Sequence, residues 1–358
     1  VLAHPAAGDA VARLRDGAQP LEPHGPAARE AGAVAALLDA LRELRRHGEF
    51  LEEFEPLSRP SALYYVGPET AHRPVLQRYR RRLEERYTAP RARGLLVFPE
   101  GHRPYGDRYR EIVERSLSVA DVHPVVRSLW GPVPLELDHV WPLSQSLIPE
   151  DIEPEAAEAA EVFFRQWASG AGYDFGVLWQ GEGTLAELEA RARGPRPVDW
   201  NLLRARATAD FQFGRGAADA LLRGKVSFVV SKNTGKIRNV IVDGEHVLSL
   251  RAEDGLFTLR APGARRLHAS LSFPRLRVVM DPDALPFLRD GKNAFARFVR
   301  AADPEIRVGD ELLLVSPEDA LCAVGRAAMN RREMLAFKRG VAAYVREGVP
   351  SPPSAPPH

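Results

Sequence analysis

The hydrophobic pattern of the first two hundred residues switches repeatedly between helical and extended periods. Apolar side chains recur at helical spacing in three segments, which predicts helices over residues 31–54, 73–87 and 153–170. Short apolar runs bounded by Pro or Gly predict strands over residues 61–67, 93–99 and 122–131. Such alternation is typical of a small α/β domain, which we place at residues 61–200. Residues 1–60 are expected to form a poorly ordered start and the first helical segment.

After a linker, "ARGPRPVDW", the pattern changes to short strands and turns. The pair Asp243–Gly244 between two β-rich runs predicts a tight hairpin inside a small α+β domain over residues 201–272. From residue 273 to 349 one helix, "RREMLAFKR", accompanies five short strands, "RVVM", "FARFV", "ELLLVS", "CAVGRAAM" and "VAAYVRE". Five strands in so short a segment predict a small, nearly closed β-barrel. The fold class is therefore α+β, with a disordered tail at 350–358.

The composition is that of a water-soluble chain. The 358 residues are 45% apolar, which is enough for several cores. No apolar stretch approaches the ~20 residues that cross a bilayer, and the N-terminal sequence lacks a signal-peptide pattern. We therefore expect a cytoplasmic protein with no membrane partner. The one cysteine, Cys322, lies in an apolar run and is expected in a core, so a disulfide within the chain and a cysteine-rich zinc site are excluded.

Charge is distributed unevenly along the chain. The formal net charge is only +1, but residues 1–203 hold 24 basic and 31 acidic side chains, whereas residues 204–358 hold 25 basic and 17 acidic ones. All five lysines lie in the second part. A basic half in a near-neutral chain favours a polyanionic partner for that half and a different contact for the acidic half.

Two polar clusters in the α/β domain have the residue types of catalytic or metal sites. In "GLLVFPEGHRPYGDRYREI", Glu100, His102 and Asp107 could form an acid/base set. A polar strand-to-helix turn, with Arg103 solvated and Tyr105 packed, accounts equally for these residues, and we favour it.

The second cluster, "LELDHVWP", brings Glu136, Asp138 and His139 together. One Glu and one His make a weak metal site, because zinc sites use at least three protein ligands. We favour a capping or interface role, and no catalytic or metal residue is assigned.

The basic residues of the second half are the preferred site residues. Lys232, Lys236 and Arg238 surround a tight turn in "SKNTGKIRN", which suits contact with phosphate and equally suits a plain polar hairpin tip. Nearby, Phe211 and Phe213 in "DFQFGRG" alternate like strand residues. Core packing is the default for both, and stacking on a base is the alternative for one of them.

A second basic group belongs to the predicted barrel. Around its helix we expect the apolar side chains of Met334, Leu335 and Phe337 to be buried. The residues expected to bind RNA in this domain are Lys292, Arg326, Arg331, Arg332, Lys338, Arg339 and Gly340. Gly340 is included because a backbone without Cβ allows close approach.

Several long motifs carry a family resemblance. The segments "YYVGPETAHRPVLQRYRRRLEERY", "GPVPLELDHVWPLSQS", "TADFQFGRGAADALL", "SKNTGKIRNVIVDGEHVLSLRAEDGLFTL" and "REMLAFKRGVAAYVREG" resemble the C-terminal half of archaeal tRNA-guanine transglycosylase. They also resemble its paralogue, archaeosine synthase. The match covers roughly residues 35–349, and its last part resembles a PUA domain, an RNA-binding β-barrel.

The resemblance implies a tRNA-binding role without the catalytic part. In the family, a preceding TIM barrel exchanges guanine in the tRNA D-arm, with catalytic aspartates and a zinc ion held by three cysteines and a histidine. This chain begins about where that barrel would end, and it has one cysteine. We therefore expect no cofactor here, zinc only on a separately encoded barrel subunit, and tRNA held for archaeosine formation. The PUA domain would hold the acceptor end, the other two domains would hold the opened D-arm, and the acidic half would dock the barrel.

Two alternatives stay open. Archaeosine synthase carries Cys and Lys-Pro-Tyr in the loop that matches residues 98–111; here Pro104 and Tyr105 remain, Arg103 replaces the Lys, and no cysteine precedes it. The loss of the group best able to act as a nucleophile weighs against synthase chemistry. The other alternative is an RNA-binding protein with no role in modification.

Overall fold

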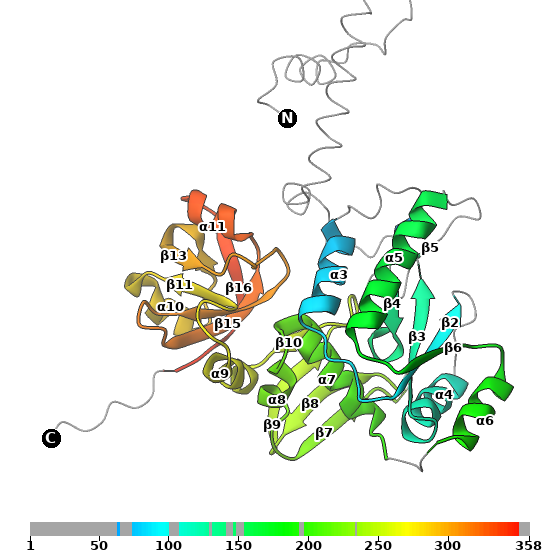
Figure 1. Cartoon of the computed structure of the whole chain (residues 1–358). Helices are drawn as coiled ribbons and strands as arrows, with labels where there is room; N and C mark the ends of the chain where they lie inside the picture. The colour runs from blue at the N-terminus through cyan, green and yellow to red at the C-terminus, as the bar shows by residue number, and fades with distance from the viewer. Residues whose placement is uncertain are drawn as a thin grey trace, which may run out of the picture.

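The computed structural model describes most of the chain in three adjoining parts. The described residues are 63–64, 74–99, 107–128, 131–140, 146–147, 154–192, 197–232 and 235–350. The expected first helix at 31–54, the loop 100–106 and all of the tail except residue 350 lie outside them. Figure 1 shows an α/β domain, a small α+β domain next to it, and a barrel-like domain on the far side of the small domain. The predicted α+β class is confirmed.

The α/β domain is built on a four-stranded sheet in the order β4-β3-β2-β6. Strands β2 (Gly94–Pro99), β3 (Val122–Ser128) and β6 (Phe175–Leu178) are parallel, and β4 (Gly131–Pro134) is antiparallel to β3. The helices around the sheet are α3 (Pro74–Glu85), α4 (Asp107–Ser118), α5 (Pro154–Gly170) and α6 (Glu182–Ala190) (Figure 1). A separate pair, β1 (Leu63–Tyr64) and β5 (Ser146–Leu147), is parallel. The predicted helices at 73–87 and 153–170 are confirmed, as is the strand at 93–99, whereas the strand predicted at 122–131 ends at Ser128 and Gly131 already belongs to the antiparallel β4.

Continuous apolar runs explain this sheet. Leu95, Leu96 and Phe98 are buried on both faces of β2, which is typical of parallel strands covered by helices on both sides. On α4, Val113 and Leu117 lie four residues apart and pack into the same core.

The small domain begins with a helix that lies between two hydrophobic cores. Helix α7 (Trp200–Phe213) starts at Asp199, whose carboxylate accepts a hydrogen bond from the backbone N–H of Leu202 at 3.0 Å. The expectation that Phe211 and Phe213 lie in a strand is wrong. Both are buried at the end of this helix, Phe211 in the core of the α/β domain and Phe213 in the core of the small domain. Their spacing resembles a strand because the helix is buried on two sides, and this burial leaves neither ring available to a base.

The rest of the small domain is an antiparallel sheet with helices on one side. Its strand order is β10-β9-β8-β7. Its elements are α8 (Ala217–Leu221), β7 (Val226–Val230), β8 (Ile237–Val242), β9 (Glu245–Leu250), β10 (Phe257–Leu259) and α9 (Ala261–Ser270). The hairpin predicted at Asp243–Gly244 joins β8 to β9 with positive φ at both residues, 52° and 84°, as the favoured two-residue turn requires.

The C-terminal domain is a six-stranded sheet in the order β12-β16-β15-β14-β11-β13. Its strands are β11 (Arg277–Met280), β12 (Ala294–Phe295), β13 (Val299–Ala302), β14 (Glu311–Val315), β15 (Leu321–Ala327) and β16 (Val341–Gly348), with helices α10 (Leu285–Arg289) and α11 (Arg331–Ala336). The predicted single strand "FARFV" is instead two strands, because a 3₁₀ turn at Ala296–Phe298 interrupts it. Cys322 is buried, as expected.

Apolar side chains dock this sheet onto the small domain. Leu313, Val315 and Val324 belong to the core of the small domain, whereas Leu312 and Leu314 belong to the core of the C-terminal domain. Alternate residues of β14 therefore face two cores, because successive side chains of a strand point to opposite faces. Among the described residues, no helix is both long and apolar enough to cross a membrane.

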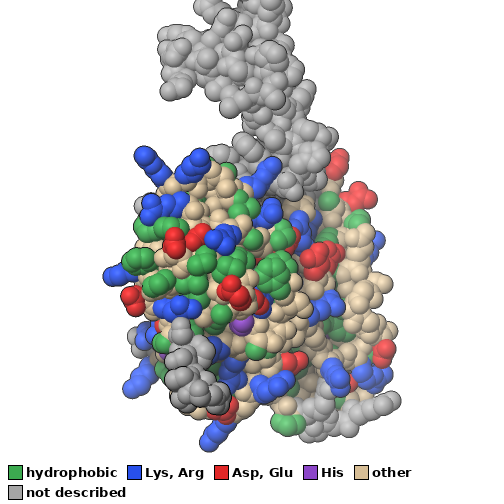
Figure 2. Space-filling model, turned by 90° about the vertical axis from the view of Figure 1, so that its left-hand side faces the viewer, with side chains coloured by type: hydrophobic (Ala, Val, Ile, Leu, Met, Phe, Trp, Pro, Cys, Tyr) green, Lys and Arg blue, Asp and Glu red, His purple; other side chains and the backbone are tan. Residues whose placement is uncertain are grey.

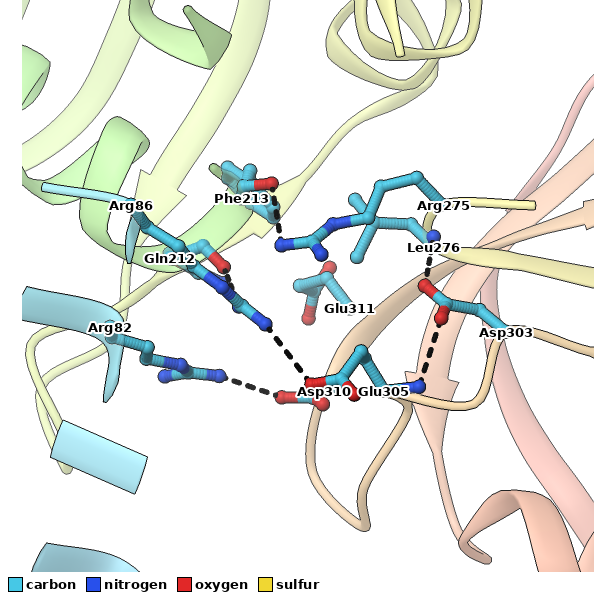
Figure 3. A pocket seen from close by; sticks show the side chains of 10 residues that line it. All are labelled: Arg82, Arg86, Gln212, Phe213, Arg275, Leu276, Asp303, Glu305, Asp310 and Glu311. Atoms are coloured by element: carbon cyan, nitrogen blue, oxygen red, sulfur yellow. Dashed lines mark hydrogen bonds and ion pairs between the residues drawn. The ribbon is translucent and has the colours of Figure 1, made fainter. Parts of the chain in front are cut away.

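An ionic contact ties the C-terminal domain to the α/β domain. Figure 3 shows Arg82 of α3 and Arg86, which directly follows this helix, reaching a loop of the C-terminal domain. Arg78 and Arg82 both donate to the Asp310 carboxylate, the latter at 3.2 Å, and Arg86 lies 3.8 Å from Glu305. Burial alone would raise the pKa of Asp310, but the two guanidinium groups outweigh it and hold that pKa below its usual value. The carboxylate therefore stays ionised between the domains.

We predict that Asp310→Ala loosens this domain contact. Removal of the carboxylate leaves the buried Arg82 guanidinium unpaired, which costs roughly 3–5 kcal/mol. The measurement is urea unfolding, and the control is Glu114→Ala, which breaks an exposed pair with Arg110 worth about 0.5 kcal/mol or less. Because folding lowers the pKa of Asp310, its contribution is present above the unfolded pKa and is lost as pH falls below about 4. Equal losses in the two variants would contradict a clamping role.

Candidate functional site

One face of the C-terminal domain exposes apolar side chains among basic ones. Figure 2 looks onto this domain and shows hydrophobic side chains interspersed with lysine and arginine. The exposed apolar side chains of this domain include Leu335 (42%), Phe337 (49%), Phe295 (45%) and Tyr344 (57%). The expectation that Leu335 and Phe337 are buried is wrong, whereas Met334 is fully buried.

The local geometry of α11 explains this exposure. Asn330 caps the helix: its side chain accepts from the Glu333 N–H at 3.0 Å, and the Glu333 carboxylate accepts from the Asn330 N–H at 2.9 Å. The helix has only six residues and is anchored in the core by Met334. The next residues on its surface, Leu335 and Phe337, are therefore turned toward solvent.

A strained turn follows α11 and carries the strongest basic candidates. Gly340 has φ +99°, and a Cβ there would lie 2.7 Å from the Met329 Cε, so the position favours glycine. Its carbonyl accepts from the Ala296 N–H at 3.0 Å, which joins the turn to the strand that carries Phe295. Lys338 and Arg339 are exposed directly before this glycine.

The other predicted residues of this domain divide into two groups. Lys292 and Arg332 are exposed, and their side chains, like those of Lys338 and Arg339, make no hydrogen bond or ion pair within the part of the chain that the structure describes. Arg331 is exposed but donates to the Ala302 carbonyl at 3.2 Å.

Arg326 is placed differently from the other predicted residues. Its guanidinium donates to the Gly309 carbonyl at 3.2 Å and to the Glu253 carboxylate at 3.0 Å. Because Glu253 belongs to the small domain, Arg326 is engaged in a contact between the two domains.

The basic hairpin of the small domain is a separate surface. Lys232 and Lys236 lie between β7 and β8, Arg238 is the second residue of β8, and all three are exposed. The turn is closed by a hydrogen bond from the Ser231 N–H to the Lys236 carbonyl at 2.8 Å, and residues 233–234 lie outside the described residues. These residues are on a different domain from Lys338 and Arg339.

The two polar clusters of the α/β domain do not form a catalytic or metal site among the residues that the structure describes. Glu100, His102, Arg103 and Tyr105 lie outside the described residues, and Asp107 is the first residue of α4. The candidate set at residues 136–139 is not brought together as a metal site.

Each member of that set has its own partner. His139 pairs with Thr208 of α7 at 3.1 Å, Asp138 lies 3.5 Å from Arg204 of α7, and Glu136 points into the α/β core. The interface role favoured for this segment is confirmed for His139 and Asp138.

Around Glu136 lies a buried polar network that the sequence did not reveal. His123 and Glu136 are fully buried, with 3.2 Å between Nε2 and the carboxylate. Tyr87 also donates to Glu136, and the Tyr173 hydroxyl lies 2.5 Å from the His123 Nδ1. Burial would raise the pKa of Glu136, but His123 and Tyr87 outweigh it and lower that pKa. The four residues come from separate segments, so no sequence spacing indicates them.

We predict that His123→Phe destabilises the chain by roughly 3–5 kcal/mol, because it leaves a buried carboxylate without its partner. The double variant His123→Phe/Glu136→Gln should be more stable than the single one, since it removes the charge and keeps an acceptor for Tyr87. Urea unfolding at neutral pH compares the variants. A double variant no more stable than the single one would show that the carboxylate charge is not what the network compensates.

Comparisons with known proteins fit this architecture. Residues 203–274 match the patch-forming domain C2 of tRNA-guanine transglycosylase, and residues 276–349 match the PUA domain. The tRNA-guanine(15) transglycosylase of Methanobrevibacter smithii is 34% identical over 327 residues, which cover 87% of this chain and 49% of the relative. That of Methanothermobacter thermautotrophicus is 34% identical over 321 residues, 87% of this chain and 48% of the relative.

One solved structure shares the fold over most of the chain. It is AF0587, a protein of unknown function, with a TM-score of 0.53 and 16% identity over 77% of this chain and 99% of that one. The chain is therefore a multidomain protein with a transglycosylase C2 domain followed by a PUA domain. It is a relative of the archaeal tRNA-guanine(15) transglycosylases and spans about half the length of the relatives it matches.

Proposed function

We propose that this chain binds tRNA for a guanine-exchange reaction in archaeosine biosynthesis, as a subunit whose catalytic barrel is on a separate chain. The observation that carries the proposal is the exposed face of the PUA domain, where aromatic rings accompany cations that have no partner among the described residues. Bases of unpaired RNA stack on such rings while phosphates attract Lys and Arg. The identity of both matched domains supports tRNA as the polyanion.

In this proposal each domain has a separate role. The PUA face takes the unpaired acceptor end, and the other two domains hold the D-arm open, because a base must leave its stack before an enzyme can exchange it. The acidic α/β half docks the barrel, which supplies the catalytic aspartates and the zinc ion. The chain itself then contributes affinity and positioning rather than a nucleophile.

The first expected outcome concerns the exchange reaction. The purified chain alone should incorporate no labelled guanine into tRNA, because the proposal assigns the reacting groups to the barrel. Added to a barrel-only transglycosylase, it should increase incorporation, most strongly at tRNA concentrations below the KM of the barrel alone. Incorporation by the chain alone, or no stimulation of the barrel, would overturn the division of roles.

A second expected outcome concerns Lys338 and Arg339. Replacing both with Ala should weaken tRNA binding and flatten its dependence on salt by about 1.4–1.8 log units per log unit, since each phosphate contact contributes about 0.7–0.9. The loss should be larger for intact tRNA than for tRNA without its 3′ end. Filter binding over a range of salt concentrations measures both effects.

Two further variants sharpen this test. Phe337→Ala should weaken binding with no change in salt slope, because stacking releases no counterions. Arg110→Ala/Arg165→Ala removes two exposed cations of the α/β domain and is the control with the same loss of charge. A slope that changes equally in the control would show a general charge effect instead of a PUA contact.

A further inference from the structure

A cavity lies at the edge of the α/β sheet where its parallel strands begin. It is open to solvent and has a volume of about 370 Å³, and its lining includes Arg91, Arg93, Asp121 and Tyr173. Backbone hydrogen bonds fasten its floor: the Arg93 N–H donates to the Asp121 carbonyl at 3.0 Å, and the Asp174 N–H donates to the Arg93 carbonyl at 2.8 Å. The segments that precede β2, β3 and β6 are thus held together in one place. The volume lies within the usual range for small-molecule sites, ~300–1,000 Å³.

The aromatic residue that lines this cavity, Tyr173, is held in place by buried neighbours. The Tyr173 hydroxyl is engaged with the His123 Nδ1 at 2.5 Å, and His123 is held by the fully buried Glu136 at 3.2 Å. The Trp167 ring packs against the same tyrosine, with centroids 6.2 Å apart. A ring held in one orientation loses little conformational entropy when a flat ligand stacks on it.

The charged groups of the cavity suit a nucleotide. Arg91 is exposed, and Arg93 keeps half of its side chain in solvent while it lies 3.5 Å from Asp174. Guanidinium groups match the geometry of phosphate oxygens, and Arg91 and Asp121 each already take part in an interaction within the chain. The lining therefore combines an aromatic ring, two guanidinium groups and one carboxylate.

We propose that this cavity binds one unpaired nucleotide of RNA, with its base on the Tyr173 ring and its phosphate at Arg91 and Arg93. The inference rests on the proposed tRNA-binding function and adds a second contact, on a different domain from the PUA face. A paired base is stacked inside its duplex and cannot reach the Tyr173 ring, so the cavity should bind single-stranded RNA in preference to duplex RNA. The buried His123–Glu136 pair acts as a positioning element for the ring.

The test uses the full chain with Lys338→Ala/Arg339→Ala, so that the PUA contribution is reduced. The probe is a fluorescein-labelled RNA of about ten nucleotides, single-stranded or annealed to its complement, and binding is read by fluorescence anisotropy. Tyr173→Leu should weaken single-strand binding roughly five- to hundredfold, the range for loss of a base–aromatic stack. Tyr173→Phe should weaken it much less, and duplex binding should change in neither variant. Arg93→Ala should flatten the salt slope, whereas Arg165→Ala on the same domain should not.

The outcomes separate this inference from the proposed function. If Tyr173→Leu binds single-stranded RNA as well as the parent chain does, the nucleotide pocket is overturned. The PUA contact is still supported in that case if Lys338→Ala/Arg339→Ala weakens tRNA binding as expected. Absence of tRNA binding by the wild-type chain overturns the proposed function. If inorganic phosphate displaces the RNA but Tyr173→Leu does not change RNA binding, the cavity is only a phosphate site. That result also overturns the inference. A lowered melting temperature in Tyr173→Leu shifts the decision to Arg93→Ala, whose side chain is on the solvent side.

Discussion

The arrangement of the molecule depends on the burial of one helix, α7, on two sides. Phe211 closes the core of the α/β domain and Phe213 closes the core of the small domain, two residues apart on one rigid element. Interiors are close-packed, so neither domain can shift along this helix without opening a cavity. The small domain in turn shares its core with the PUA sheet through β14 and β15. The three domains are thereby joined through apolar contacts, and the surfaces that remain exposed keep fixed relative positions.

Ion pairs also connect the domains at their interfaces. Asp310 between Arg78 and Arg82, and Arg326 with Glu253, are contacts between parts of the chain far apart in sequence. Buried ion pairs add little net stability, since desolvation offsets their attraction, but breaking one is costly. Both contacts join the PUA domain to another domain, and only the Asp310 pair is largely buried. Arg326, one of the residues expected to bind RNA, makes one of these contacts between domains.

The surfaces left over are the ones suited to RNA. The docking of the PUA sheet uses the face opposite to α11, which leaves Phe337 and Lys338 in solvent. In the α/β domain, the beginnings of the parallel strands leave the cavity beside Tyr173. Both places combine a ring with cations, and they lie on different domains. A folded RNA such as tRNA is large enough to touch two such places at once, and simultaneous contacts raise affinity through effective concentration.

The sequence by itself determined most element types, the α+β class and the basic character of the second half, because periodicity, turn residues and charge are local properties. It placed Lys338 and Arg339 in the helical segment "RREMLAFKR", whereas α11 ends at Ala336. Only the tertiary structure decided which sides are buried. Phe211 and Phe213 mimic a strand because two cores meet at one helix, and Leu335 and Phe337 are exposed because six residues of α11 need only Met334 as an anchor. The network of Tyr87, His123, Glu136 and Tyr173 joins four segments, so its existence depends on long-range packing that no local pattern encodes.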